Sequence, residues 1–481
     1  MNTMFNITHI VSFVIRSVLC VPFIFRSTKL ITKNTTIVLL SIMMMGNASC
    51  KSQNSKSIQP GIILSDSALL DLVQKETIKY FTDGAEPVSG MAAERIHTDN
   101  IYPENDKHII TSGGSGFGVM ALIVAIERKF IAREEGLQRL EKIVHFLETA
   151  DRFHGAWPHW WNGETGKVKP FSKKDDGGDL VETSFMIQGL LCVRQYYKDG
   201  NEKEKALAQR IDKLWKEVEF DWYRNGKNVL YWHWSPNYDW QMNFAVRGYN
   251  ECLIMYILAA SSPTHGVPAE VYHEGWADSG RIISPHKALG YELQLRYQGN
   301  PPNAAPLFWS HYSYLGLDPK GLKDQYADYW KENTNQTLIN YTWCVENPKK
   351  FKGYGKNNWG LTASYSTKFY SAHAPNPKDD LGVITPTAAL SSFPYTPKES
   401  MAALRHWYTD MNDKVVGPYG PYDAFSETDG WYPLKYLAID QGPIPVMIEN
   451  YRTGLLWKLF MSCPEIQNGL KKLGFTSPYI K

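Results

Sequence analysis

Two kinds of helical pattern alternate along this chain, and their alternation constrains the fold more than any other feature. Segments 117–126, 180–193 and 252–260 are apolar on every side, whereas 134–150 and 202–220 carry apolar residues along one stripe. A helix that is apolar all round must be surrounded by other elements, and a striped helix must cover something. The alternation therefore predicts an all-α barrel of helical hairpins, with an inner ring of helices inside an outer ring.

The C-terminal part continues the pattern less regularly. Segments 322–345 and 399–408 look striped, and 446–460 looks like one buried helix. Few runs have the two-residue period of strands, so parallel β/α units are not indicated. Because no Gly/Ser or Pro tract divides the chain, we predict a single domain over residues 61–481.

Composition and charge exclude several classes of protein. The chain has 481 residues, 43% of them apolar, and its 51 basic and 49 acidic residues leave a formal net charge of +2. Without a basic field, nucleic acid is not an expected partner. The cysteines are scattered and form no Cys-x-x-Cys pair, so neither a metal site nor a disulfide scaffold is indicated.

The first 60 residues read as a targeting segment and linker. Lys29 and Lys33 precede the apolar run 37–45, and small residues then lead to Cys50. This order predicts a bacterial lipoprotein signal with Cys50 as the lipidated residue, although Asn47 stands where Leu is usual. The apolar stretch 11–25 is either a second anchor or an overextended start of the reading frame. We expect an exported lipoprotein of the periplasm or outer membrane that touches the membrane only through its lipid.

Acidic residues gather just before the buried segment 180–193. Asp175, Asp179 and Glu182 lie there, and Asp179 and Glu182 are spaced to share one helix face. An acidic first turn stabilises a helix by itself, and fixed carboxylates also suit acid chemistry or hydroxyl binding. The nearby Trp157 and Trp160 favour the second interpretation, because flat rings beside carboxylates match the faces and hydroxyls of a sugar.

Two further acids repeat this placement. Glu251 directly precedes the buried segment 252–260, where capping and function are equally compatible with the pattern. Asp440 lies between Ile439 and a Gly-Pro turn ahead of 446–460, a position that is unfavourable for ordinary solvent exposure. Acids at the starts of inner helices would converge at one rim of the barrel. Glycosidic cleavage needs two of them, one protonated near neutral pH and one ionised to activate water.

Other candidates give weaker signals. Trp309, His311, His373 and Arg452 could add contacts to a sugar, although each alone is more typical of a structural role. The Gly-rich run 113–118 follows no convincing strand and lacks the Lys-Ser/Thr of a phosphate loop, so it indicates close packing at a helix start. Neither Gly-x-Ser-x-Gly nor His-Glu-x-x-His occurs.

Several motifs together resemble a known family. They are Asp175-x3-Asp179-x2-Glu182 and the segments 249–251, 308–313, 359–364, 417–425 and 440–443. In combination they resemble the glycoamylase-like domain, and within it the bacterial β-1,2-glucanases of glycoside hydrolase family 144. The resemblance covers residues 65–475.

The resemblance implies a single (α/α)6 barrel that hydrolyses β-1,2-linked glucan with inversion, without metal or cofactor. It places the functional acids at Asp175, Asp179, Glu182, Glu251 and Asp440. Our hypothesis makes Glu251 the general acid and Asp440 the base acting through water. The three acids near the start of 180–193 then bind sugar hydroxyls or tune the acid.

Alternatives remain open at this point. A glycosidase of the same fold could act on another linkage, and the family includes both endo-acting and disaccharide-releasing enzymes. A non-catalytic glycan-binding lipoprotein of an uptake system would need the aromatic residues but not the acids at three helix starts. We expect a monomer whose partner is a glucan oligosaccharide or polysaccharide.

Overall fold

The computed structural model describes residues 64–102, 107–298, 301 and 303–480. The expected leader, the linker and Cys50 therefore lie outside the described residues. Within the described part of the chain, no helix is both long and apolar enough to cross a membrane.

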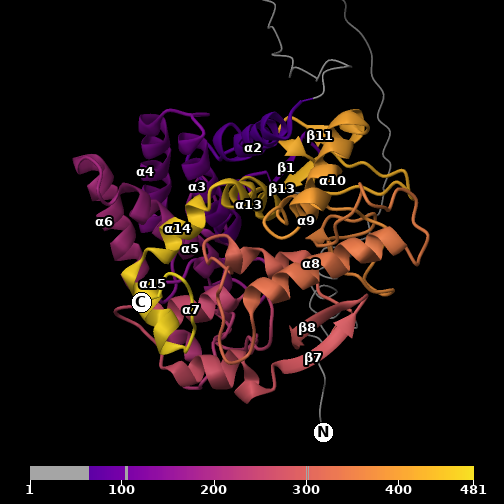
Figure 1. Cartoon of the computed structure of the whole chain (residues 1–481). Coiled ribbons are helices and arrows are strands. Elements are labelled where there is room, and N and C mark those ends of the chain that lie inside the picture. Colours follow the sequence, from indigo (N-terminus) through magenta and orange to yellow (C-terminus); the bar gives the residue numbers. More distant parts are fainter. Residues whose placement is uncertain (1–63, 103–106, 299–300, 302, 481) are drawn as a thin grey trace, which may run out of the picture.

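A closed inner ring forms the centre of the molecule (Figure 1). Its members, in chain order, are α3 (Ser112–Glu127), α5 (Leu180–Tyr197), α7 (Leu253–Ser261), the short turns η4 (Leu307–Ser310) and η5 (Tyr312–Tyr314), α9 (Pro386–Leu390), α12 (Ala438–Gln441) and α13 (Pro443–Arg452). Each packs on the next, and α12 and α13 return to α3. Where η5 meets the end of α9, the ring of His311 lies 3.0 Å from the Ser392 hydroxyl.

Outer helices cover this ring. They are α2 (Asp66–Thr82), α4 (Arg133–Thr149), α6 (Glu202–Lys216), α8 (Tyr329–Glu346), α10 (Pro397–Thr409) and α15 (Pro464–Lys472). Between α7 and η4 the described residues form no long helix, only η2 (Val271–Trp276), η3 (Asp278–Gly280) and the hairpin of β7 (Ile283–Ala288) and β8 (Tyr291–Leu295). Instead α15, from far along the sequence, packs against α7 (Figure 1). The architecture is the predicted (α/α)6 barrel.

The structure corrects two details of the predicted helices. Segment 446–460 is not one helix, because the chain turns at Gly454, whose φ is +70°, between α13 and α14 (Leu455–Met461). The striped helix expected from residue 322 begins only at Tyr329, where Asp328 caps it by accepting a hydrogen bond from the amide of Lys331. The alternation of surrounded and covering helices from α3 to α7 is confirmed.

Short strands lead directly into three inner helices. β2 (Ile109–Thr111), β5 (Gly178–Asp179) and β13 (Lys435–Leu437) precede α3, α5 and α12. Each pairs antiparallel with a distant strand, respectively β3 (Trp160–Asn162), β6 (His233–Trp234) and β1 (Arg95–His97). Backbone ladders therefore fix the points at which these helices begin.

The remaining elements are small and lie outside the ring. They are β4 (Val168–Lys169) on β3, the pair β9 (Ala363–Ser364) and β10 (Ser371–Ala372), the pair β11 (Val416–Gly417) and β12 (Gly420–Pro421), the helix α11 (Asn412–Val415) and the turn η1 (Trp222–Arg224). In the described residues the inner ring itself contains no strand.

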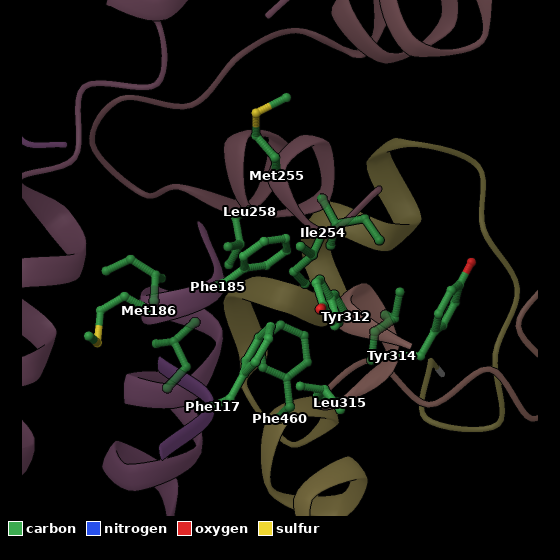
Figure 2. Close-up of a cluster of buried hydrophobic side chains, with 14 of the residues drawn as sticks. Phe117, Phe185, Met186, Ile254, Met255, Leu258, Tyr312, Tyr314, Leu315 and Phe460 are labelled. Carbon is green, nitrogen blue, oxygen red and sulfur yellow. The ribbon is translucent and has the colours of Figure 1, made fainter. Parts of the chain in front are cut away.

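Aromatic and aliphatic side chains fill the ring (Figure 2). The rings of Phe117, Phe185 and Tyr312 come from α3, α5 and η5, and their centroids lie 5.0–5.6 Å apart. Ile254 and Phe460 add aliphatic and aromatic contacts from α7 and α14. Burying such a side chain contributes roughly 1.5–3 kcal/mol, so this layer both stabilises the barrel and forms a rigid floor.

Glycines allow α3 and α5 to approach closely. A Cβ added at Gly189 would lie 2.1 Å from the carbonyl oxygen of Gly116, and one added at Gly116 would lie 2.5 Å from the carbonyl oxygen of Phe185. No side chain fits there. The prediction that the Gly-rich run 113–118 serves close packing at a helix start is confirmed.

The contact between α3 and α5 yields a stability prediction. Gly189→Ala should lower the free energy of unfolding by about 1–3 kcal/mol, because its methyl group meets backbone that cannot move aside. Urea unfolding followed by circular dichroism measures the change. Gly355→Ala is the matched control, since nothing lies within 4 Å of a Cβ added there. Equal stabilities of the two variants would contradict the close packing.

Candidate active site

Asp179 is fully buried where β5 passes into α5. Its Oδ1 accepts a hydrogen bond from the amide of Glu182 at 2.9 Å, which caps the helix. Its Oδ2 accepts from Trp232 Nε1 at 3.0 Å and lies 2.9 Å from His159 Nδ1. Asp179 therefore both caps the helix and supplies a fixed carboxylate that other side chains contact. The two interpretations of this acid, helix stabilisation and a fixed functional carboxylate, apply together.

Two histidines balance the acids before α5. His233 Nε2 lies 3.0 Å from Asp175 Oδ2 and 3.6 Å from Asp179 Oδ2. Although burial opposes its charge, the carboxylates of Glu182, Asp179 and Asp175 raise the pKa of His159 to about 10. Burial likewise opposes the charge of His233, yet Asp175 and Asp179 raise its pKa too. These buried carboxylates are therefore paired with cationic imidazoles.

His159, Asp175 and Asp179 also offer ligand atoms within 4.8 Å of one another, close enough to surround a metal ion. Their contacts do not favour that use. Asp179 Oδ2 already receives the Trp232 hydrogen bond, and His159 would have to lose its proton to act as a ligand. The set is better described as an ion-pair network.

Glu182 lies one turn further along α5 and reaches the start of α3. Its Oε2 accepts a hydrogen bond from the amide of Gly113 at 2.7 Å, and a Cβ at position 113 would lie 2.4 Å from that oxygen. Burial first, and then the neighbouring charges of Asp179 and Asp175, raise the pKa of Glu182 to about 7, against the opposing effect of His159. Its environment therefore favours the protonated form more than that of an ordinary glutamate.

Glu251 stands just before α7 and is only 8% exposed. Burial, followed by the charges of Glu182 and Asp179, raises its pKa to about 7. The starts of α5 and α7 therefore bring their acids into the same electrostatic environment. A carboxyl that keeps its proton near neutral pH suits a general acid.

Asp440 lies in the first turn of α12 and is 1% exposed. The hydroxyl of Tyr312 is 3.4 Å from its Oδ1. Burial raises the pKa of Tyr312, and so do the charges of Asp440, Glu182 and Glu251. One hydroxyl, carried by the floor of the ring, thus lies among acids from three inner helices.

Asp423 was not selected from the sequence. It is 2% exposed, its Oδ2 accepts a hydrogen bond from the amide of Tyr365 at 2.9 Å, and its carboxyl group lies within hydrogen-bonding distance of that of Asp440. It lies in the motif 417–425 but at no helix start, so the reasoning that selected Asp440 could not reach it. Its only local signal is the apolar pair Ala424 and Phe425 that follows.

Other residues of the site were also missed. His159 and His233 lie in aromatic stretches in which the tryptophans, not the histidines, indicated sugar binding. The ring of Tyr370 is 43% exposed, while burial, Asp440 and Asp423 raise the pKa of its hydroxyl. Tyr370 therefore combines an open ring face with a hydroxyl near the acids, a combination that suits a sugar.

The predicted tryptophans separate into different environments. Trp160 is partly exposed, and its ring packs 4.7 Å from that of Phe171 and 5.6 Å from that of His159, beside the acids. Trp157 is completely buried and donates to the carbonyl of Leu147, so the prediction that it contacts sugar is wrong. Trp309 is 7% exposed and packs against aromatic neighbours.

The remaining predicted contacts have structural surroundings. His311 and His373 are buried, and burial lowers their pKa values to about 3 and about 4, so both rings are neutral. Arg452 pairs with Asp71 at 2.6 Å, at the end of α13 that lies twelve residues, or about 18 Å of helix, from Asp440. The prediction that Arg452 contacts sugar at the acid cluster is wrong.

Comparisons with known proteins agree with this geometry. A family model described as putative glucoamylase matches residues 243–464. An exo β-1,2-glucooligosaccharide sophorohydrolase of Parabacteroides distasonis is 46% identical over 426 residues, which are 85% of this chain and 58% of that protein. The chain thus spans little more than half the length of this curated relative.

Solved structures are more similar still. An endo-β-1,2-glucanase from Chitinophaga pinensis, in complex with sophorotriose and glucose, is 71% identical with a TM-score of 0.86, covering 87% of this chain and 100% of that one. A putative glucoamylase from Bacteroides caccae is 66% identical with a TM-score of 0.84, covering 86% and 100%. The chain belongs to the glycoamylase-like family of glycoside hydrolases that includes the bacterial β-1,2-glucanases, family 144. The resemblance inferred from the motifs is confirmed.

The network around Asp179 yields a second prediction. Asp179→Asn should lower the free energy of unfolding at pH 7 by about 1–3 kcal/mol, because its amide NH₂ must face either the N–H of Glu182 or those of Trp232 and His159. The difference from wild type should shrink in acid. The lowered pKa of Asp179 means that its carboxylate stabilises the fold above its ordinary pKa and stops doing so as pH falls through the folded value.

Urea titrations at several pH values measure this effect. Asp199→Asn, at a carboxylate whose side chain is 83% exposed, is the control and should leave stability nearly unchanged. A pH-independent loss in Asp179→Asn would show that charge pairing is not the cause.

Proposed function

We propose that the protein hydrolyses β-1,2-linked glucan with inversion at the anomeric carbon. The observation that carries this proposal is the meeting of Glu182, Glu251 and Asp440 around the Tyr312 hydroxyl. Relatives that carry the name β-1,2-glucanase or sophorohydrolase, up to 71% identical, support the substrate class.

The environments of the acids divide their roles. Glu251, with a pKa of about 7, holds a proton that it can donate to the glycosidic oxygen. Asp440, from the opposite part of the ring, takes the proton of the attacking water. Asp175, Asp179 and Glu182 bind sugar hydroxyls or tune the acid, and the charges of Glu182 and Asp179 favour the protonated form of Glu251.

The setting of the activity is part of the proposal. The substrate is a glucan oligosaccharide or polysaccharide, cleaved within the chain or by release of the disaccharide from an end. The protein acts as a monomer in the periplasm or at the outer membrane. It is held there by lipid on Cys50, with no cofactor.

Glu251→Gln should reduce kcat on linear β-1,2-glucan by at least roughly 10³-fold while the protein stays folded, since the amide has no proton to donate. In the wild type, kcat should fall as pH rises through about 7, because Glu251 loses its proton there. Reducing-sugar assays across the pH range measure both effects.

Glu332→Gln is the matched control. Glu332 is another buried glutamate whose pKa burial raises to about 7, but it accepts hydrogen bonds from the amides of Gln294 and Leu295 and the hydroxyl of Tyr297. This variant should keep most of the activity. Near-normal turnover by Glu251→Gln would remove Glu251 from the mechanism.

A product analysis tests the linkage. Purified protein incubated with linear β-1,2-glucan should release oligosaccharides, whereas linear β-1,3-glucan should remain intact. Sophorose alone indicates attack from a chain end, and a ladder indicates internal cleavage. Binding of β-1,2-glucan without any cleavage would instead establish a glycan-binding lipoprotein.

A further inference from the structure

Asp423 and Asp440 form a pair of carboxyl groups in direct contact. Both side chains are almost fully buried, and their carboxyl groups lie within hydrogen-bonding distance of each other. Tyr365 and Tyr312 each engage one oxygen of the pair, while Asp423 Oδ1 and Asp440 Oδ2 have no other partner among the described residues. Two carboxyls in contact away from water cannot both ionise, so the pair holds one proton.

Main-chain contacts hold both members in place. The amide of Ala438 donates to the carbonyl of Glu94 at 3.0 Å, on the β1–β13 ladder that leads to Asp440. The amide of Asp423 donates to the carbonyl of Lys435 at 2.9 Å, at the other end of the same strand. Since β13 fixes both residues, the contact between their carboxyls is part of the fold.

The charged groups that face the pair do not favour the loss of its proton. The charge of Glu94 raises the pKa of both carboxyls, and Arg95 is already paired with Glu94. Among the described residues, the other titratable or charged groups near the pair are the hydroxyls of Tyr312 and Tyr370, and Lys435, whose Nζ lies 5.2 Å from the ring of Tyr365, the residue whose backbone amide donates to Asp423.

We propose that Asp423 is a positioning residue that makes the Asp423–Asp440 pair, rather than Asp440 alone, the base of the reaction. This inference rests on the hydrolysis proposed above. Asp423 touches Asp440 and acts through it, so the water is activated by two carboxyls that share one proton and one negative charge.

Atoms and charges are conserved in the hydrolysis step. The oxygen of water bonds to the anomeric carbon while the glycosidic C–O bond breaks with its electron pair on the leaving oxygen. Glu251 gives its proton to that oxygen and becomes a carboxylate. The pair takes the proton of the water and changes from singly charged with one proton to neutral with two. After product release the pair returns a proton to solvent, and Glu251 regains one.

The pair titrates as a unit. Burial raises the pKa of Asp423 to about 6, and burial together with Asp423 raises that of Asp440 well above its ordinary value. Between these steps the pair is singly charged and can accept a proton. Activity should therefore be lost as pH falls through about 6, because the pair then already carries two protons.

Two substitutions at Asp423 separate this arrangement from simpler ones. In Asp423→Asn the amide oxygen can accept from Tyr365 while the NH₂ donates to an ionised Asp440, so the acidic limb of the kcat profile should stay or move to lower pH. In Asp423→Leu the buried Asp440 loses the carboxyl with which it shares a proton. The pH midpoint of the acidic limb of the kcat profile should therefore rise by at least about one pH unit. At pH 6, kcat of the leucine variant should then fall at least about fivefold, with KM nearly unchanged.

These directions exclude the alternatives. If Asp423 were an ordinary ionised neighbour, both substitutions would remove a negative charge and move the limb to lower pH. If it served only the fold, neither would move it. Either result overturns the proposal. Asp318→Asn is the matched control, because burial also raises the pKa of Asp318 but its contacts are Lys320 and Tyr479. The acidic limb of its kcat profile should have the same pH midpoint as that of the wild type.

Infrared spectroscopy tests the pair without turnover, including the case in which the leucine variant does not fold. At about pH 8.5, above the pKa of Glu182 and Glu251, the wild type should keep a protonated-carboxyl band. Asp423→Asn and Asp440→Asn should each lose this band, and Asp318→Asn should keep it.

Absence of the band in the wild type, or its persistence in both variants of the pair, overturns the shared proton. Because this readout needs no substrate, the inference and the proposed function can fail separately. A wild type that shows the band but cleaves no glucan contradicts only the proposed function.

Discussion

The hydrogen bond from the amide of Gly113 to Glu182 depends on the close packing of α3 against α5. It requires α3 and α5 to approach until the carbonyl of Gly116 occupies the space that a side chain at Gly189 would need. With the helices at this separation, Glu182 is held by backbone at the start of α3. Gly114 brings α12 equally close, since a Cβ there would lie 2.7 Å from that of Ala438. Packing between glycine-bearing helices therefore brings their acids to one rim.

Burying so many carboxyls would be unfavourable without compensation, and the structure compensates in two ways. Before α5, His159 and His233 lie beside Asp175 and Asp179, and against the effect of burial the two histidines lower the pKa of Asp179. At Glu251 and Asp440 no cation is adjacent in the described part of the chain, and burial raises the pKa of both instead. The first group provides fixed negative charge, and the second provides the proton donor Glu251 and the base Asp440. This division is what acid and base chemistry at one sugar linkage requires.

Sequence patterns predicted the parts of the fold that depend on single helices. The alternation of surrounded and striped segments placed α3 to α7 correctly, and the acids at the starts of α5, α7 and α12 were found because each precedes an apolar run. The fourth position of the inner ring was not predictable in the same way. There the chain forms the short turns η4 and η5, whose buried residues include Ser310, His311 and Ser313 and so give no apolar helical pattern.

Contacts between distant segments could not be predicted from local sequence patterns either. Strands of two or three residues, such as β5 and β13, gain stability from partners about 50 to 340 positions away, and so leave almost no periodicity. Asp423 was missed for the same reason, because main-chain hydrogen bonds at the two ends of β13, rather than sequence spacing, bring it to Asp440. The errors at Trp157 and Arg452 came from residue type, which does not reveal whether a ring or a guanidinium is already engaged by the core or by a neighbouring acid.

The position of α15 has a consequence for biosynthesis. Because α7 is covered by a helix roughly 200 residues further along the chain, its outward apolar face finds no partner until that late segment has emerged from the ribosome. The same holds for the seam between α3 and α12, which closes the ring. A nascent chain of this kind exposes a large apolar surface for most of its synthesis, so the acids of its inner helices can come together only in the last stage of folding.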